Sequence, residues 1–182
     1  MMKSSILRLF CDCAPMRGGF TLIEVLIVVV IIGITAMMAV PMLTAAGSVQ
    51  VRSAANMLAA DLEYAKSMAI SRGQRYSVSF DTADENYWLL DEDGDTIEHP
   101  VRKGFSYSFD FDESDRLSDV VISSCAFEPG SRSVVTFDYL GCPYSGSDMS
   151  NALSSGYVRL RGGKVTLDVN IEPVTGYISI TD

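Results

Sequence analysis

Residues 17–25 read RGGFTLIEV, and no further charged residue occurs between this stretch and Pro41. A helix over residues 20–40, rising about 1.5 Å per residue, is long enough to cross the ~30 Å hydrocarbon core of a membrane. Glu24 is the only charged residue in that segment, and an ionised carboxylate in hydrocarbon costs about 2.5 kcal/mol or more unless it is partnered. The stretch therefore predicts a membrane-spanning helix whose glutamate is paired with a group from outside the helix.

The arrangement of Gly19, Phe20 and Glu24 ahead of a hydrophobic helix resembles the processing site of type IV prepilins and type II secretion pseudopilins. In that family a prepilin peptidase cuts after the glycine and methylates the new N-terminus. The resemblance implies cleavage between Gly19 and Phe20, N-methylation of Phe20, and an assembly contact between Glu24 and the terminal amine of a neighbouring subunit. It also implies a helix bend at Pro41. The alternative is an ordinary single-pass anchor with a stray glutamate.

Charge predicts the orientation of the chain. Lys3, Arg8 and Arg17 precede the span, so the positive-inside rule places the N-terminus in the cytoplasm. We therefore expect a bacterial inner-membrane protein whose C-terminal domain is periplasmic, and which joins a periplasmic pseudopilus after assembly. The formal charge is -9, and loss of residues 1–19, which carry +2, would leave -11. This sign disfavours nucleic acid as a partner.

The helical pattern continues beyond Pro41 but becomes amphipathic. Apolar residues recur every three or four positions, which predicts one buried helix face: Val51, Ala55, Leu58, Leu62, Ala65 and Ala69. Polar residues fall on the other faces: Arg52, Asn56, Asp61, Glu63 and Lys66. Gly73 is the expected C-cap. We predict one long helix, broken or bent at Gly33, Pro41 and Gly47.

After Gly73 the hydrophobic period changes from 3.6 to 2, which is typical of strands. The predicted strands of a mainly antiparallel sheet are 76–80, 87–90, 105–111, 120–123, 133–138, 157–161, 164–171 and 177–181. Two glycines between residues 161 and 164 indicate a hairpin turn, and 145–155 is expected to be a surface loop. The fold class is therefore α+β, with segments 1–19 (cleaved leader), 20–41 (transmembrane helix), 42–73 (amphipathic continuation) and 74–182 (periplasmic β-rich domain).

Later segments narrow the resemblance to the GspH/FimT family of minor pseudopilins and minor pilins. They are residues 76–80, 137–143, 165–171 and 173–178, whereas the acidic region 81–119 has no recognisable counterpart. The resemblance implies a pilin-like fold and a minor pseudopilin of type II secretion, without cofactor or catalysis. Its partners would be prepilin peptidase and other pseudopilins or pilins in a hetero-oligomeric fibre. The alternative is a minor pilin that acts in type IV pilus assembly or DNA uptake.

The four cysteines form two pairs in the sequence. Cys125 and Cys142 lie in the exported domain, where an oxidising compartment favours a disulfide worth about 3 kcal/mol. Cys11 and Cys13 lie in the leader, and no third ligand accompanies them for a metal site.

Two further features bear on metal binding and catalysis. Residues 91–95 read DEDGD, which resembles a calcium loop but has Thr96 and Arg102 where an EF-hand requires glycine and glutamate. A hairpin turn is the preferred interpretation, with calcium binding as the alternative. His99 is the only histidine and is expected in an exposed turn, which leaves a membrane-tethered enzyme as a weaker hypothesis.

A small basic cluster bears on DNA binding. Arg159, Arg161 and Lys164 lie close together, and charge on a solvated hairpin explains them more simply than DNA does. FimT-type members are associated with DNA uptake through basic residues near the C-terminus, whereas this chain ends in YISITD without arginine.

Overall fold

The computed structural model describes residues 19–182, apart from the side chains of residues 38–46. The predicted leader, with Cys11 and Cys13, lies outside these residues except for Gly19. The chain divides into two units, the first ending at Val40 and the second running from Pro41 to Asp182.

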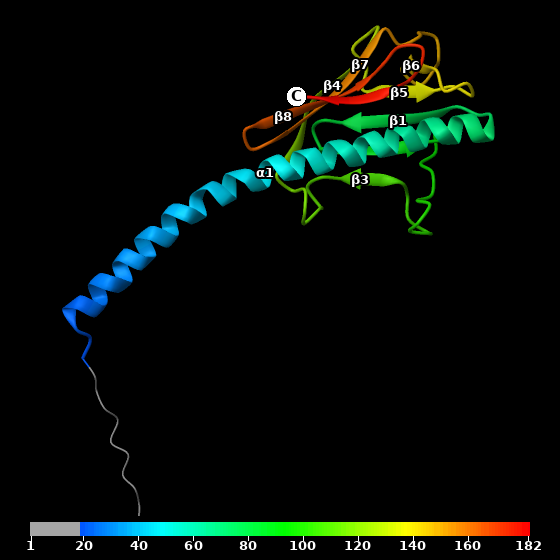
Figure 1. Cartoon of the computed structure of the whole chain (residues 1–182). Coiled ribbons are helices and arrows are strands. Elements are labelled where there is room, and N and C mark those ends of the chain that lie inside the picture. Colours follow the sequence, from blue (N-terminus) through cyan, green and yellow to red (C-terminus); the bar gives the residue numbers. More distant parts are fainter. Residues whose placement is uncertain (1–18) are drawn as a thin grey trace, which may run out of the picture. The chain divides into compact units, whose positions relative to one another are not determined.

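One long helix belongs to both units. Helix α1 runs from Leu22 to Arg72 without interruption, so the breaks considered at Gly33, Pro41 and Gly47 do not occur (Figure 1). The bends at these three residues, including the one at Pro41, stay predictions. At the other end, Gly73 has a φ of 66° and its N–H donates to the carbonyl of Ala69 at 3.0 Å. This left-handed glycine is the predicted C-cap.

Among the residues that the structure describes, no helix is long and apolar enough to cross a membrane. The span expected over residues 20–41 is thus not confirmed and stays a prediction.

The second unit is organised on the apolar face of α1. All six residues of the predicted stripe are fully buried, and they join one core cluster with side chains from both sheets. Val51 shows how close the packing is, because a Cβ placed on Gly162 would collide with its Cγ2 atom. The turn between β7 and β8 therefore approaches the helix as closely as it does only because position 162 has no side chain.

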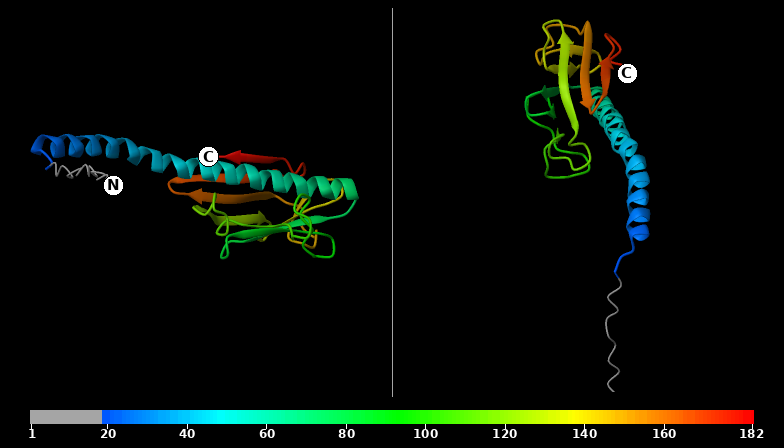
Figure 2. Two further views of the ribbon diagram at one scale, coloured as in Figure 1. Left: turned by 90° about the horizontal axis from the view of Figure 1, so that it is seen from below. Right: turned by 90° about the vertical axis from the view of Figure 1, so that its left-hand side faces the viewer.

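Two antiparallel sheets make up the rest of this unit, where the sequence had predicted one (Figures 1 and 2). The five-stranded sheet has the order β3-β2-β1-β5-β6, with β1 (Tyr76–Asp81), β2 (Asn86–Leu90), β3 (Ser108–Asp110), β5 (Val134–Phe137) and β6 (Pro143–Ser145). The four-stranded sheet has the order β4-β7-β8-β9, with β4 (Val120–Glu128), β7 (Ser155–Gly162), β8 (Val165–Ile171) and β9 (Ile178–Thr181).

The strand predictions are mostly confirmed, and the differences have local causes. The hairpin at residues 161–164 forms, with Gly162 paired to Val165. Strand β4 is longer than expected and contains a register shift between Ile122 and Ser124. Of the aromatic row over 105–111, only 108–110 is a strand. The acidic region 81–119 is no separate insertion, because it contains β2 and β3 of the five-stranded sheet.

A buried hydroxyl links the two sheets. Ser145, at the end of β6, is fully buried, and its Oγ donates to the carbonyl oxygen of Phe127 in β4 at 2.6 Å. The same region was expected to be a surface loop, but Ser145 and Leu153 are both buried. The loop between β6 and β7 therefore contributes to the core instead of lying wholly on the surface.

Candidate functional site

The start of α1 is organised by Thr21. Its Oγ1 accepts the backbone N–H of Glu24 at 3.3 Å, and its carbonyl accepts the N–H groups of Glu24 and Val25 at 3.1 and 3.2 Å. Thr21 is thus the N-cap of a helix whose first residue is Leu22. Thr21 and Glu24 have the spacing of a capping box, Thr-x-x-Glu, and this signal is present in the sequence itself.

Glu24 therefore lies in the first turn of α1, where the positive end of the helix dipole favours a carboxylate. Its side chain is exposed, and within residues 19–37 and 47–182 it has neither an ion pair nor a hydrogen-bond partner. The cap at Thr21 accounts for where the helix begins, whereas the charge of Glu24 has no counter-ion within residues 19–37 and 47–182.

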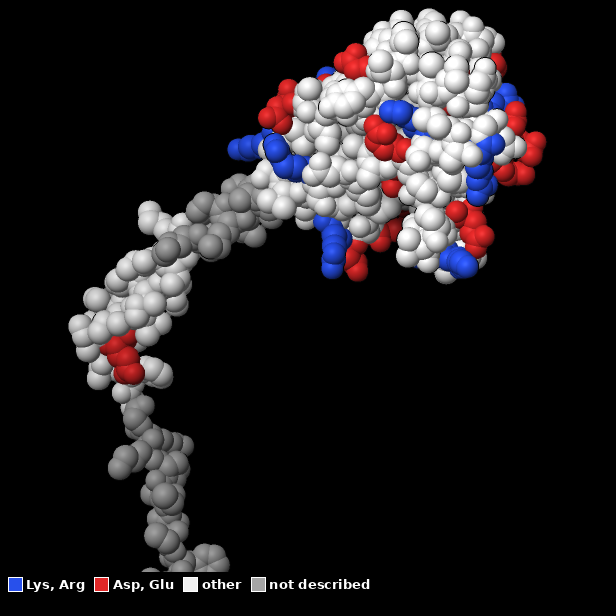
Figure 3. Space-filling view, turned by 45° about the vertical axis from the view of Figure 1, so that its right-hand side comes forward, with Lys and Arg blue, Asp and Glu red and all other residues white. Residues whose placement is uncertain are grey.

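The residues around Glu24 expose apolar surface on every side of the helix. Phe20 is 79% and Leu22 84% exposed, and the large apolar side chains between them and Met37 are all exposed as well. On the face shown in Figure 3, the described part of this segment carries a single acidic group in an uncharged surface. A helix that is apolar all round is stable only when lipid or other helices cover it.

Gly19 and Phe20 precede the helix and are exposed. A Cβ placed on Gly19 would meet no atom within 4 Å. The chain itself therefore does not require glycine at this position. Gly19 and Phe20 lie just before Thr21, and Glu24 follows in the first turn of α1. The cleavage site itself stays a prediction.

A second polar site lies within the folded domain. Asp61 of α1 accepts hydrogen bonds from two tyrosine hydroxyls, Tyr87 of β2 at 2.5 Å and Tyr107 at 2.8 Å. The ring of Tyr107 lies between those of Tyr64 and His99, with centroid distances of 5.4 and 4.7 Å and interplanar angles of 16° in both cases. One carboxylate thereby attaches the segment between β2 and β3 to the helix.

The electrostatics of this site follow from its burial. Desolvation raises the pKa of Asp61 above its ordinary value, and the hydrogen bonds from Tyr87 and Tyr107, which stabilise the charged form, offset only part of this effect. Burial also raises the pKa values of both tyrosines, and the nearby carboxylate adds to the shift. The tyrosines therefore remain hydrogen-bond donors at any physiological pH.

The sequence pattern predicts that Asp61 and Lys66 lie on polar helix faces, but it does not predict these contacts. Lys66 donates from Nζ to the carbonyl of Gly176 at 2.9 Å, and its side chain is largely covered. Both polar residues therefore hold loops of the domain, one for each sheet. Alternation of polar and apolar residues cannot show this, because it gives the face on which a residue lies and not what covers that face.

The acidic segment at residues 91–95 forms the expected turn. Asp91 donates its N–H to the carbonyl of Asp95 at 2.9 Å, and its Oδ1 accepts the N–H groups of Asp93 and Asp95 at 3.0 Å each. No group of three or more potential metal ligands occurs in the described part of the chain. The hairpin interpretation is confirmed.

His99 also lies in a turn, but it is half-buried and not exposed as expected. Its Nδ1 accepts the N–H groups of Val101 and Arg102 at 3.2 and 3.1 Å, while its ring stacks on Tyr107. The imidazole is thus engaged in shaping the loop.

The predicted disulfide between Cys125 and Cys142 is not formed, since both thiols are free. The reason is topological, because Cys125 pairs with Val158 inside the four-stranded sheet, whereas Cys142 precedes β6 of the five-stranded sheet. Burial raises the pKa of both thiols, which disfavours the reactive thiolate.

The basic cluster agrees with the simpler interpretation. Arg159 makes two hydrogen bonds of 2.7 Å to the carboxylate of Asp168 on the adjacent strand, and its guanidinium lies over the ring of Tyr157. This arginine is neutralised within the sheet, so it offers less to a phosphate backbone than the sequence had indicated.

These features define a pilin-type subunit: a helix with an apolar, glutamate-bearing first segment, whose second segment is buried against antiparallel sheets. The chain matches the family described as type II transport protein GspH over residues 54–175, and the prokaryotic N-terminal methylation motif over residues 15–40. The first match covers more than half of the chain, so the chain belongs to the GspH family.

Solved structures show similarity at low identity. The type IV minor pilin FimU of Pseudomonas aeruginosa, in one crystal form, is 16% identical, covering 72% of this chain and 88% of its own, with a TM-score of 0.46. The minor pseudopilin EpsH from the type 2 secretion system of Vibrio cholerae is 13% identical, covering 72% and 96%, with a TM-score of 0.49. Such likenesses concern the fold alone. No individually curated protein matches the chain.

Family membership carries several consequences. GspH-type proteins are structural subunits, so the chain is a pilin or pseudopilin and not an enzyme. The methylation motif implies processing by a prepilin peptidase, and the family implies assembly with other pilin-type subunits in the cell envelope.

The raised pKa of Asp61 can be tested through the pH dependence of the stability of the fold. A carboxyl whose pKa is raised in the folded state binds protons more tightly when folded, so its contribution to stability is greatest at low pH. That contribution is lost as pH rises from the ordinary value of 3.8 through the folded pKa. We expect the free energy of unfolding of the wild type to fall relative to that of Asp61→Asn between about pH 4 and about pH 7.

Denaturant unfolding of the full chain in detergent at the two pH values measures this difference. Asp84→Asn removes an exposed carboxylate from the β1–β2 turn and is the matched control, with no comparable change expected. A wild-type stability that rises relative to Asp61→Asn with pH would show that the tyrosine hydrogen bonds outweigh desolvation.

Proposed function

We propose that the chain is a minor subunit of the periplasmic pseudopilus of a type II secretion system. The observation that carries this proposal is the match to the type II transport protein family across residues 54–175, which covers five of the six residues of the apolar stripe of α1 and eight of the nine strands in the described part of the chain. An Arg159 neutralised by Asp168 favours secretion over DNA uptake.

Processing would occur between Gly19 and Phe20. Both residues are exposed and precede the capped start of α1, which makes the peptide bond between them accessible to a membrane peptidase. Removal of residues 1–19 creates a new amine on Phe20, which is then methylated. Thr21 and the first helical turn remain intact after the cut.

The apolar segment would reside in the inner membrane before this cut and after it, with the N-terminus in the cytoplasm and residues 74–182 in the periplasm. The exposed apolar side chains on all sides support this proposal. Thr35 supports it too, because its hydroxyl donates to the carbonyls of Ile31 and Ile32 at 3.0 Å each and so needs no water. Helix bending at Pro41 would belong to the same segment.

In the fibre, apolar segments of several subunits would bundle and exclude water. The Glu24 carboxylate, which has no partner among the described side chains, would then bind the amine of Phe20 on a neighbouring subunit. If one subunit slipped by one step along the fibre axis, the Glu24 carboxylate and the Phe20 amine would both be unpaired in a bundle that excludes water. The ion pair therefore selects the axial register of neighbouring subunits. The cap at Thr21 places the exposed glutamate in the first turn, four residues after the new amine of its own subunit.

Deletion of the gene tests whether this subunit serves a type II secretion system or a type IV pilus. Loss of exported proteins from the culture medium, restored by the wild-type chain, is the expected result. Intact secretion together with loss of surface pili or of DNA uptake would instead assign the chain to a type IV pilus. Neighbouring genes for secretion components would give the same answer at less cost.

Cleavage can be tested at Gly19. Because a Cβ at this position would meet no atom within 4 Å, Gly19→Ala should leave the fold unchanged and affect only cleavage by the peptidase. We expect the uncut precursor to accumulate, as measured by the intact mass of the purified protein. A normal mature N-terminus beginning at Phe20 would refute the processing site.

The role of Glu24 needs a variant that separates assembly from helix capping. Glu24→Gln retains a group that can complete the capping box but has no charge, and Glu24→Ala has neither. Both should be inserted and cut at Gly19 yet fail to enter the fibre, as measured by cosedimentation with assembled fibre and by mass spectrometry. If Glu24→Gln assembles normally while Glu24→Ala does not, the residue acts through capping and the charge pair is wrong.

A further inference from the structure

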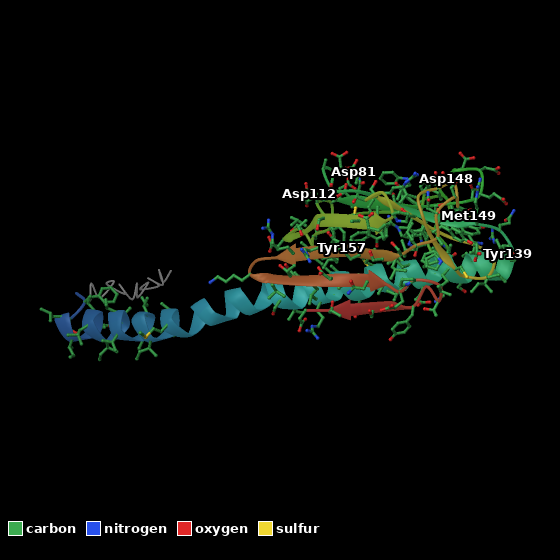
Figure 4. All side chains as sticks on the ribbon, turned by 90° about the horizontal axis from the view of Figure 1, so that it is seen from above. Asp81, Asp112, Tyr139, Asp148, Met149 and Tyr157 are labelled. Carbon is green, nitrogen blue, oxygen red and sulfur yellow. The ribbon has the colours of Figure 1, made fainter. Side chains whose placement is uncertain are left out.

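Five exposed apolar residues gather where α1 ends. Ile70, Tyr139, Leu140, Val174 and Tyr177 are 51%, 59%, 67%, 75% and 61% exposed, and we call them the end patch. They come from three segments in contact: a Cβ on Gly141 would lie 2.9 Å from Ile70 Cδ1, and one on Gly176 would lie 2.7 Å from the carbonyl oxygen of Gly141. Figure 4 shows Tyr139 at this end of the domain, with Asp81 and Asp112 toward the other.

Val174 lowers the stability of the folded domain in two ways. Its φ is 66°, a left-handed conformation that β-branched residues rarely adopt, and its apolar side chain is the most exposed of the patch. Glycine or asparagine would remove both disadvantages, so the turn itself gives no reason for valine. A residue that costs stability by conformation and by exposure is better explained by a contact outside the chain.

Both turns of the patch are held in place before any partner binds. Asp138 is buried, and its Oδ1 accepts the N–H groups of Leu140 and Cys142 at 2.9 and 2.8 Å. The turn around Val174 closes through the N–H of Gly176 to the carbonyl of Glu172 at 3.1 Å. Lys66 fixes this turn to the helix through the carbonyl of Gly176. A preorganised patch loses little conformational entropy when it binds.

The size of the patch decides the kind of partner. Five side chains at these exposures present on the order of 500 Å² of apolar surface, whereas a stable complex needs about 800 Å² per partner. The end patch alone is therefore too small to hold a dimer in solution. It suits a partner that a second interface already keeps nearby, because tethering raises the effective concentration.

We propose that the end patch binds the globular domain of a neighbouring pilin-type subunit in the same fibre. This inference rests on the proposed function, since bundled apolar helices would supply the second interface. The contact is weak by itself and becomes effective only between subunits that are already anchored side by side.

A photocrosslinker at position 177 of the full-length chain, expressed in its own cells, tests the proposal. Tyr177→p-benzoylphenylalanine should give an adduct whose partner, identified by mass spectrometry, carries its own N-terminal methylation motif. Tyr157→p-benzoylphenylalanine, on β7, is the matched control and should give little of that adduct. A chain that enters the fibre without this adduct, or with an adduct to a protein lacking the motif, overturns the end patch and leaves the proposed function standing. A chain absent from the fibre overturns both.

A second variant separates binding from folding. Val174→Gly removes the strain and the exposed side chain, so the melting temperature should rise by about 2–4 °C while incorporation into the fibre falls severalfold. Glu85→Gly relieves another left-handed residue, of φ 53°, in the β1–β2 turn, and should leave incorporation unchanged. Unaltered incorporation of Val174→Gly, or dimerisation of the wild type in detergent through the patch, would contradict the proposal.

Discussion

Burial of one face of α1 is the constraint on which the rest of the domain depends. Seven residues from Val51 to Ala69 are completely buried, and four of them are alanines, which allow strands and turns to approach the helix backbone. The absence of a side chain at Gly162 lets the β7–β8 turn reach the helix at Val51. Both sheets share their core with this stripe, so neither has a complete hydrophobic core without it.

Polar residues on the same helix then position the loops. Asp61 holds the segment between β2 and β3 through Tyr87 and Tyr107, and Lys66 holds the turn between β8 and β9 through Gly176. Each is a charged group that is partly buried, and each accepts or donates hydrogen bonds that offset part of the free-energy cost of its desolvation. One face of the helix thus packs in the core, and polar residues on its other faces hold the loops in position.

The two ends of the helix differ in what they leave uncovered. At its start, Thr21 caps the helix, and exposed apolar residues surround Glu24, which lacks a counter-ion among the described residues. At its end, the apolar residues around Ile70 lie on turns that the domain holds in a fixed conformation. Membership of the GspH family accounts for such surfaces, because a fibre subunit completes its buried area only with its neighbours.

The sequence by itself determined the helix, most strands, the C-cap at Gly73 and the grouping of Gly19, Phe20 and Glu24, because these follow from periodicity and from residues adjacent in the chain. It did not determine the division into two sheets, the free state of Cys125 and Cys142, or the roles of Asp61 and Lys66. Those features depend on which segments distant in sequence become neighbours. Only tertiary packing decides this, since a periodic pattern shows that a face will be buried but not which residues will cover it.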